Sequence, residues 1–198
     1  MKNNFRGMLK MKFNISVVLL AMSAFSTQAA TDLGLVTFDG AVTDTTCKVT
    51  TNNGLDAHNV TISMPIVTKA AVLDGTAASK EFELKLSECE ETLTAAKISF
   101  TSQQFAELST GTLKPDATVS GAAENVNIAL FNNGNGSTNQ VKIGDPADAS
   151  QELDLSETNG GVFAYKAKYV PSADMNATSN PIIAGKVNTN ATFTLAYE

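Results

Sequence analysis

The sequence predicts an all-β protein made of many short strands, either a β-sandwich or a barrel. Apolar and polar side chains alternate at period 2 in several segments, such as "KEFELKLSEC" at 80–89 and "GVFAYKAKYV" at 161–170, and this period indicates half-buried strands. Clusters of Gly, Asn, Asp and Pro between them favour turns. Many short strands separated by turns are typical of a sandwich or barrel. Cys47 and Cys89 favour the sandwich, because a disulfide would join a strand near Cys47 to the strand that ends at Cys89.

The expected strands differ in how clearly the alternation marks them. The clearest are 80–89, with Phe82, Leu84 and Leu86 on one face, then "NVNIALF" at 125–131, 161–170, and a last strand within 184–198. Shorter candidates are "KVTT" at 48–51, "HNVTISM" at 58–64, "KISFTS" at 97–102 and "QVKIG" at 140–144. No long amphipathic helix is expected, although "VTKAAVL" at 67–73 and "SQQFAEL" at 102–108 could each form a helical turn or two.

The first residues predict a secretory signal rather than a domain. A basic start is followed by an apolar run from Phe13 to Ala24 and then by small residues. Cleavage fits best after Ala29, which makes residues 1–29 the signal peptide, and cleavage after Ala30 is an alternative. Met8 and Met11 offer alternative starts. The remaining chain suits one domain of ordinary size.

The charge of the mature chain argues against nucleic acid and anionic membranes as partners. The leader removes four of the 14 basic residues and no acidic ones, so 10 basic residues face 20 acidic ones and the net charge is −10. Nucleic acids and anionic lipids need concentrated positive charge. The composition therefore predicts a solvated acidic surface.

The residue types needed for catalysis are scarce, so we expect neither an enzyme nor a metal or other cofactor. The mature chain has one histidine, His58, no arginine, and only Cys47 and Cys89 as thiols. An even number of cysteines in an exported chain predicts a disulfide rather than a reactive thiol. These observations predict an exported structural or interaction protein.

Both ends of the mature chain carry patterns that resemble those of a known family. Near the start, Gly34, Val36, Phe38 and Gly40 form a Gly-x-Val-x-Phe-x-Gly run ahead of Cys47. The segment 82–89, with its Phe-x-Leu-x-Leu-x-x-Cys pattern, "NVNIALFNNGN" and "YKAKYV" follow, and the end carries Gly185 as the fourteenth residue from the C-terminus and Tyr197 as the penultimate one. Together these resemble the pilin subunits of chaperone–usher fimbriae from Gram-negative bacteria, particularly type 1-like major subunits.

This resemblance implies an incomplete immunoglobulin-like β-sandwich, a pilin fold that lacks its last strand and carries an N-terminal donor-strand extension. Residues 30–39 would be the extension and 40–198 the pilin domain. The missing strand would leave an acceptor groove, filled first by a periplasmic chaperone and then, at the outer-membrane usher, by the extension of another copy. The implied wall of the groove is Gly185, Val187, Ala191, Phe193, Leu195 and Tyr197, with the terminal carboxylate of Glu198 held by the chaperone.

The donor residues implied by the resemblance are Gly34, Val36 and Phe38, with Gly34 placed where the groove is shallow. A shift by one residue would insert Leu33, Leu35 and Thr37 instead, because successive side chains of a strand point to opposite faces.

The function that the resemblance implies is that of an extracellular structural subunit. The chain would pass through the periplasm and polymerise with copies of itself and with related pilins into a cell-surface fimbria that supports adhesion or biofilm formation. The alternative is a single-domain minor, adapter or adhesive subunit that binds a host ligand.

Overall fold

Strands account for most of the regular structure of the chain. A computed structural model describes residues 47–51, 54, 56–57, 59–134, 137–145, 147–148 and 151–198, and these lie in one compact unit. The predicted secretory signal and donor residues lie outside the described residues. The described elements, in chain order, are β1 (Lys48–Thr51), α1 (Lys69–Leu73), β2 (Lys80–Ser87), β3 (Ala95–Thr101), β4 (Ala106–Glu107), β5 (Thr112–Leu113), β6 (Val126–Asn132), β7 (Gln151–Asp154), β8 (Gly161–Pro171) and β9 (Thr192–Tyr197).

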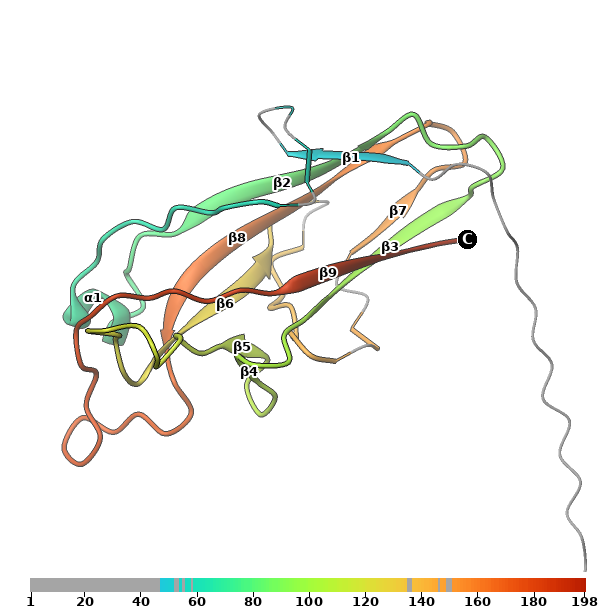
Figure 1. Cartoon of the computed structure of the whole chain (residues 1–198). Helices are drawn as coiled ribbons and strands as arrows, with labels where there is room; N and C mark the ends of the chain where they lie inside the picture. The colour runs from blue at the N-terminus through green and yellow to red at the C-terminus, as the bar shows by residue number, and fades with distance from the viewer. Residues whose placement is uncertain are drawn as a thin grey trace, which may run out of the picture. The chain divides into compact units, whose positions relative to one another are not determined.

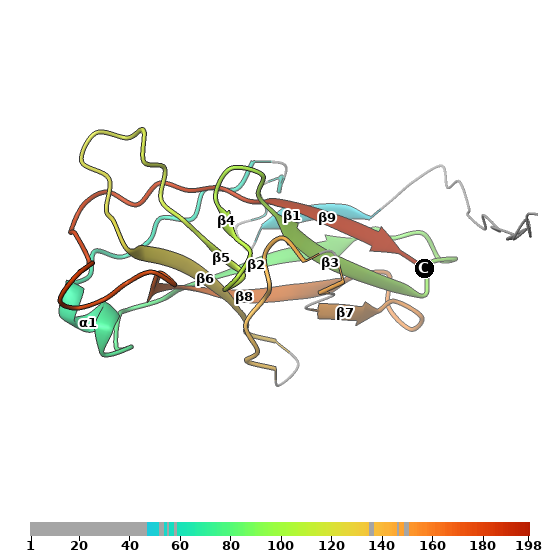
Figure 2. The same cartoon turned by 90° about the horizontal axis from the view of Figure 1, so that it is seen from below.

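The strands form two antiparallel sheets (Figure 1). The larger sheet has the order β1-β2-β8-β6-β5-β4, and the smaller has the order β7-β3-β9. The long strand β8 lies between β2 and β6, where Phe82 is opposite Tyr165 and Ile128 is opposite Tyr169. The last strand, β9, runs alongside β3, and the segment that leads into it comes from the end of the molecule where α1 lies (Figures 1 and 2).

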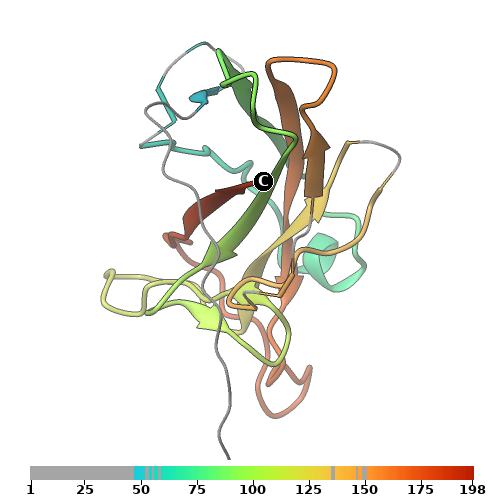
Figure 3. The same cartoon turned by 90° about the vertical axis from the view of Figure 1, so that its right-hand side faces the viewer.

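The core lies between the two sheets, which face each other in the view of Figure 3. Leu84, Phe163 and Tyr165 come from the larger sheet, and Ile98 and Phe100 come from the smaller one; all five are buried. The rings of Phe100 and Tyr165 meet edge to face, with centroids 5.0 Å apart, a geometry that aromatic pairs favour. The expected all-β sandwich is confirmed.

The one helix of the described ranges is short and capped. Thr68 precedes α1, and its hydroxyl accepts a hydrogen bond from the backbone N–H of Ala71 at 3.2 Å, as an N-cap residue does. Val72 is buried in a second apolar cluster with Ala123, Val126 and Ile182. The predicted helical turn at 67–73 is confirmed. Nowhere in the described ranges is a helix long and apolar enough to span a bilayer.

The predicted disulfide is confirmed. Cys47 and Cys89 are joined, and both are buried. Cys47 directly precedes β1, and Cys89 follows the end of β2, which pairs with β1 so that Lys48 lies opposite Ser87. The bond therefore closes the open end of the β1–β2 pair.

Some predicted elements were wrong in type or length. The segment 102–108, expected as a helical turn, contains β4. The predicted strand 140–144 makes a single bridge, between Gln140 and Phe131. The segment 59–64 is extended but pairs with no described strand. Within 184–198, only Thr192–Tyr197 forms a strand.

We expect that replacing Cys47 and Cys89 together by serine lowers the free energy of unfolding by about 4 kcal/mol, because the loop they close spans 42 residues. Urea unfolding of the oxidised protein, the reduced protein and the double variant measures this. Reduced wild type should unfold like the variant. Equal stability of all three would show that the β1–β2 pairing alone holds this end of the sheet.

Candidate interaction groove

The outer edge of β9 has no strand beside it in the described part of the chain. β9 is the end strand of the smaller sheet, and it pairs with β3 alone, with Phe193 opposite Phe100 and Leu195 opposite Ile98. Backbone N–H and C=O groups on the other side of an edge strand are free to pair with another strand. This edge is thus a template for strand addition.

A second segment, 59–67, also has no strand beside it among the described residues, and it lies across an apolar groove from β9. No backbone hydrogen bond joins it to any described residue. Its side chains nevertheless alternate as in a strand: Val60, Ile62 and Met64 are half-buried, and the residues between them are exposed. The sequence pattern is therefore that of a strand, but its partner is not among the described strands.

Between these two edges lies an apolar groove with a volume of about 940 Å³. Its floor is formed by buried or half-buried residues of both sheets, namely Phe82, Leu84, Phe100, Leu113, Ile128, Leu130 and Ala167. One wall is the segment 59–64, and the other is 187–195, which includes the first part of β9. We call this hollow the acceptor groove. An extended chain laid in it would face apolar side chains below and free backbone groups on both sides.

The wall along 187–197 alternates as the sequence predicts. Its odd-numbered residues are half-buried, and its even-numbered residues are exposed. Of the residues predicted for this wall, Val187, Ala191, Phe193 and Leu195 line the groove. Tyr197 packs against the core beyond the lining, and burial raises the pKa of its hydroxyl.

Gly185 lies outside the groove lining and has a different role. A Cβ atom at this position would come within 2.5 Å of the Gly121 carbonyl oxygen, the Ala122 carbonyl carbon and the Ala123 nitrogen. The next residue, Lys186, donates to the Gly121 carbonyl oxygen and accepts from the Ala123 N–H, each at 2.8 Å. Gly185 thus allows two backbones to meet where the wall begins.

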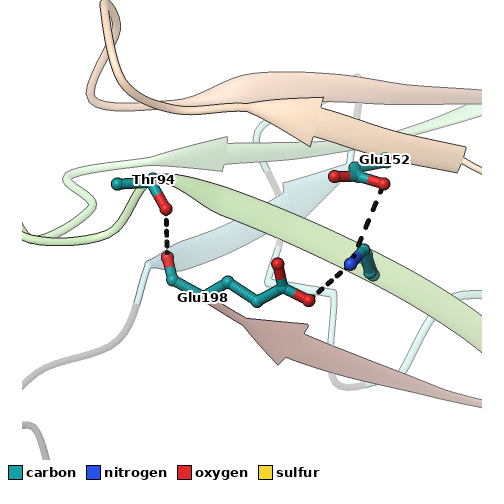
Figure 4. A network of polar contacts seen from close by, with 4 residues as sticks. Thr94, Glu152 and Glu198 are labelled. Atoms are coloured by element: carbon teal, nitrogen blue, oxygen red, sulfur yellow. Dashed lines mark hydrogen bonds and ion pairs between the residues drawn. The ribbon is translucent and has the colours of Figure 1, made fainter.

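The other end of this wall is fastened to β3. The N–H of Glu198 donates to the Ala95 carbonyl oxygen at 3.0 Å. Its backbone oxygen accepts from the N–H of Thr94 at 2.6 Å and from the Thr94 hydroxyl at 3.1 Å (Figure 4). Lys97 contacts the side-chain carboxylates of Glu198 and Glu152, and its hydrogen bond to Glu198 raises the pKa of its ammonium group. Recognition of Glu198 by a chaperone stays a prediction.

Two features of the groove were missed in the sequence. The opposite wall was predicted as a strand, but nothing in the sequence assigned Val60, Ile62 and Met64 to a binding surface. Thr189 was left out of the predicted wall because it is polar, although it shares the odd-numbered register of Val187 and Ala191. Period 2 places Thr189 in the register of this wall, whereas no local pattern brings 59–64 to the opposite side of the groove. Among the described residues, no group of three or more His, Cys, Asp or Glu side chains is placed to hold a metal ion.

An all-β sandwich with an unpaired strand edge beside an apolar groove, as seen in the described part of the chain, has the features that β-strand addition requires. A family model described as "Fimbrial protein" matches residues 36–198, and the chain belongs to this family. The resemblance seen in the sequence is confirmed.

Relatives of similar length match along nearly the whole chain. "Long polar fimbria protein A" of Salmonella typhimurium is 26% identical over 96% of this chain and 98% of its own. "Probable major fimbrial subunit LpfA" of Escherichia coli O157:H7 is 27% identical over 95% and 100%. "Major fimbrial subunit" of Haemophilus influenzae is 29% identical over 92% and 97%. Among solved structures, the CupB6 tip adhesin from Pseudomonas aeruginosa aligns with 60% of this chain and 30% of its own, at 18% identity and a TM-score of 0.45.

We expect Gly185→Ala to destabilise the protein by about 1–3 kcal/mol, because the added methyl group must push apart two backbones that are in contact. Thermal unfolding measures the effect. Gly134→Ala is the matched control, since its new Cβ would meet the Ala164 Cβ at 3.4 Å, the Gln151 side-chain nitrogen at 3.7 Å and the Ala164 backbone nitrogen at 3.9 Å, all ordinary contact distances. A Gly185→Ala protein as stable as the control would contradict the close approach.

Proposed function

We propose that the chain is a structural subunit of a cell-surface fimbria, and that it polymerises when the N-terminal segment of one copy fills the acceptor groove of the next. Family membership and the names of the relatives, two of which are described as major fimbrial subunits, support the fimbrial part of this proposal. The fibre would support adhesion or biofilm formation.

The acceptor groove is the observation that carries the polymerisation step. Its two edges face no strand in the described part of the chain, and Phe82, Phe193 and Leu195 stay half-buried on its surface. A strand laid between the edges would bury these side chains and supply hydrogen bonds to both backbones. Each fully buried aliphatic or aromatic side chain contributes about 1.5–3 kcal/mol, and each hydrogen bond contributes about 0.5–1.5 kcal/mol net. Filling the groove could therefore drive assembly without a cofactor or energy source.

The occupant we propose is the segment 30–39 of a second copy. It precedes the described part of the chain and alternates Gly34, Val36 and Phe38 with Leu33 and Leu35. Fully extended, it spans about 30 Å from its first to its last Cα atom at about 3.3 Å per residue. The wall from Val187 to Leu195 needs about 26 Å at the same rise. The segment is long enough to line the whole wall.

Before assembly the groove is a liability, because an unpaired apolar edge promotes aggregation. We therefore propose that a periplasmic chaperone first lends a strand and that an outer-membrane usher directs the exchange. An adapter subunit would use the same groove. The relatives' names favour a major subunit, so the adapter is the second candidate.

The mature chain, residues 30–198, should form multimers that resist dissociation, and the chain without residues 30–38 should not. A peptide of residues 30–40 added to the shortened chain should bind and raise its melting temperature, because it completes both edges. Thermal unfolding and size-exclusion chromatography measure this, with a peptide of scrambled order as control. A shortened chain that is already stable and ignores the peptide would rule out the incomplete fold.

Gly34→Phe separates the two registers of the inserted strand. If Gly34, Val36 and Phe38 point into the groove, the bulky side chain blocks multimers while a complex with the chaperone still forms. Leu35→Asp is the matched variant, since it would point outward and be tolerated. Normal multimers from Gly34→Phe, together with none from Leu35→Asp, would assign the inserted set to Leu33, Leu35 and Thr37.

A further inference from the structure

Three exposed apolar side chains lie at the end of the molecule that carries α1. Ile66 is fully exposed, and Leu73 and Ile183 each expose 47% of their surface. Each of them is next in sequence to a residue that packs in the second apolar cluster, namely Val67, Val72 and Ile182. The three side chains therefore surround one cluster and turn away from it into solvent. We call them the apolar end face.

The apolar end face borders one end of the acceptor groove. Ile66 follows the wall 59–64, and Ile183 precedes the wall 187–195. Val187, the first residue of that second wall, packs both against the main core and against the cluster beneath the end face. A strand that leaves the groove at this end therefore emerges beside the apolar end face.

The described chain begins toward the opposite end of the molecule. The start of β1, the turn between β2 and β3, and the C-terminus lie toward the end away from α1 (Figures 1 and 2). We call this the Cys47 end, because Cys47 is joined there to Cys89. The N–H of Cys89 donates to the Asn159 carbonyl oxygen at 3.2 Å, which brings the turn after β7 to the same place. Glu91 and Glu157 are exposed in these two turns.

We propose that the apolar end face is a docking surface for the Cys47 end of a second copy, the copy whose segment 30–39 fills the groove. This inference rests on the proposed function. Two different ends then meet head to tail, and such a contact repeats without closing, as a fibre requires. The incoming strand would run antiparallel to β9, because its last residue must leave the groove at the Val187 end.

The length of chain ahead of Cys47 keeps the second copy close to this end of the groove. Residue 39 and Cys47 are eight positions apart in the sequence, which is at most about 26 Å at about 3.3 Å per residue. A tethered domain has a high effective concentration at the surface beside it, so even a small apolar contact strengthens the joint. The inserted strand thus brings the second domain to the apolar end face.

The charges of the two ends favour the same arrangement. Lys69 and Lys186 are exposed beside the apolar end face, and Asp74 and Glu124, also exposed there, balance them. The Cys47 end presents the carboxylates named above. Because the mature chain has twice as many acidic as basic residues, most pairs of surfaces from two copies repel each other. Contact between a balanced end with lysines and an acidic end avoids that repulsion.

The test compares multimers of the full mature chain with those of the double variant Ile66→Ser, Leu73→Ser. The variant should still form multimers, because its groove is unchanged. These should dissociate about tenfold faster on heating than wild type, since two apolar side chains no longer leave water at the joint. Leu108→Ser is the matched control, because Leu108 is 73% exposed but lies between β4 and β5. It should dissociate like wild type.

A labelled peptide of residues 30–40 separates the docking surface from the groove. The peptide carries no domain, so it should bind the open groove at the end of each multimer equally well in wild type, variant and control. Equal binding shows that the variant is folded and that its groove is intact. Faster dissociation together with equal peptide binding is the result that supports docking at the apolar end face.

Cross-linking with a carbodiimide, which joins an ammonium group to a carboxylate in contact with it, locates the docking surface. Lys69 and Glu91 lie toward opposite ends of one copy, so a bond between the α1 end and the turn 88–93 must join two copies. We expect such bonds in wild-type multimers, identified by mass spectrometry. Their absence, with equal dissociation of variant and wild type, would overturn the docking surface and leave strand insertion intact. A wild-type chain that forms no multimers would overturn both.

Discussion

The constraint on which the structure depends is that two backbone edges face each other across an apolar floor without a strand between them. β9 has a single neighbouring strand, β3, among the described strands, and 59–67 has none. Contacts outside the groove must therefore hold the wall 187–195 in place at both of its ends. Gly185 provides this at one end through its contact with the backbone of 121–123, and Glu198 provides it at the other through Thr94 and Lys97.

Much of the fold could be predicted because its long strands are half-buried on one face. In β2 and β9, apolar residues such as Leu84 and Phe193 alternate with exposed ones, so period 2 is visible. The shortest strands gave no such signal. β4 and β5 have two residues each, and β5 joins the larger sheet through the single pairing of Leu113 with Ile128, a tertiary contact that no local pattern contains. In β6, which the alternation in the sequence predicted as a strand, Asn127 and Ala129 are buried together with Val126 and Ile128, so both faces of the strand are covered.

The groove could be predicted only in part, because its two walls come from segments that are far apart in the sequence. Val187, Ala191, Phe193 and Leu195 were predicted as one wall of an acceptor groove; they line the hollow described above, and their role in accepting a strand stays a prediction. That Val60 and Ile62 face them follows from the way the chain passes from β1 to α1, which no local pattern contains. Gly185 was predicted to be part of the wall. It lies just before this segment, and what it provides there is a close approach of two backbones. Thr189 shares the odd-numbered register of this wall, which a search for apolar residues alone passes over.

The contacts of Glu198 with β3 also bear on how the protein would resist a pulling force. In a fibre joined by inserted strands, tension would act along β9 and would load its hydrogen bonds in shear, all at once, instead of opening them one after another. Fraying begins at the ends of a strand, so extra contacts at these ends add most to its resistance. At the Glu198 end, backbone bonds to Thr94 and Ala95 are reinforced by the ionic contact with Lys97, which Glu152 extends to β7 (Figure 4). The pulling force would thus be distributed over the three strands of the smaller sheet.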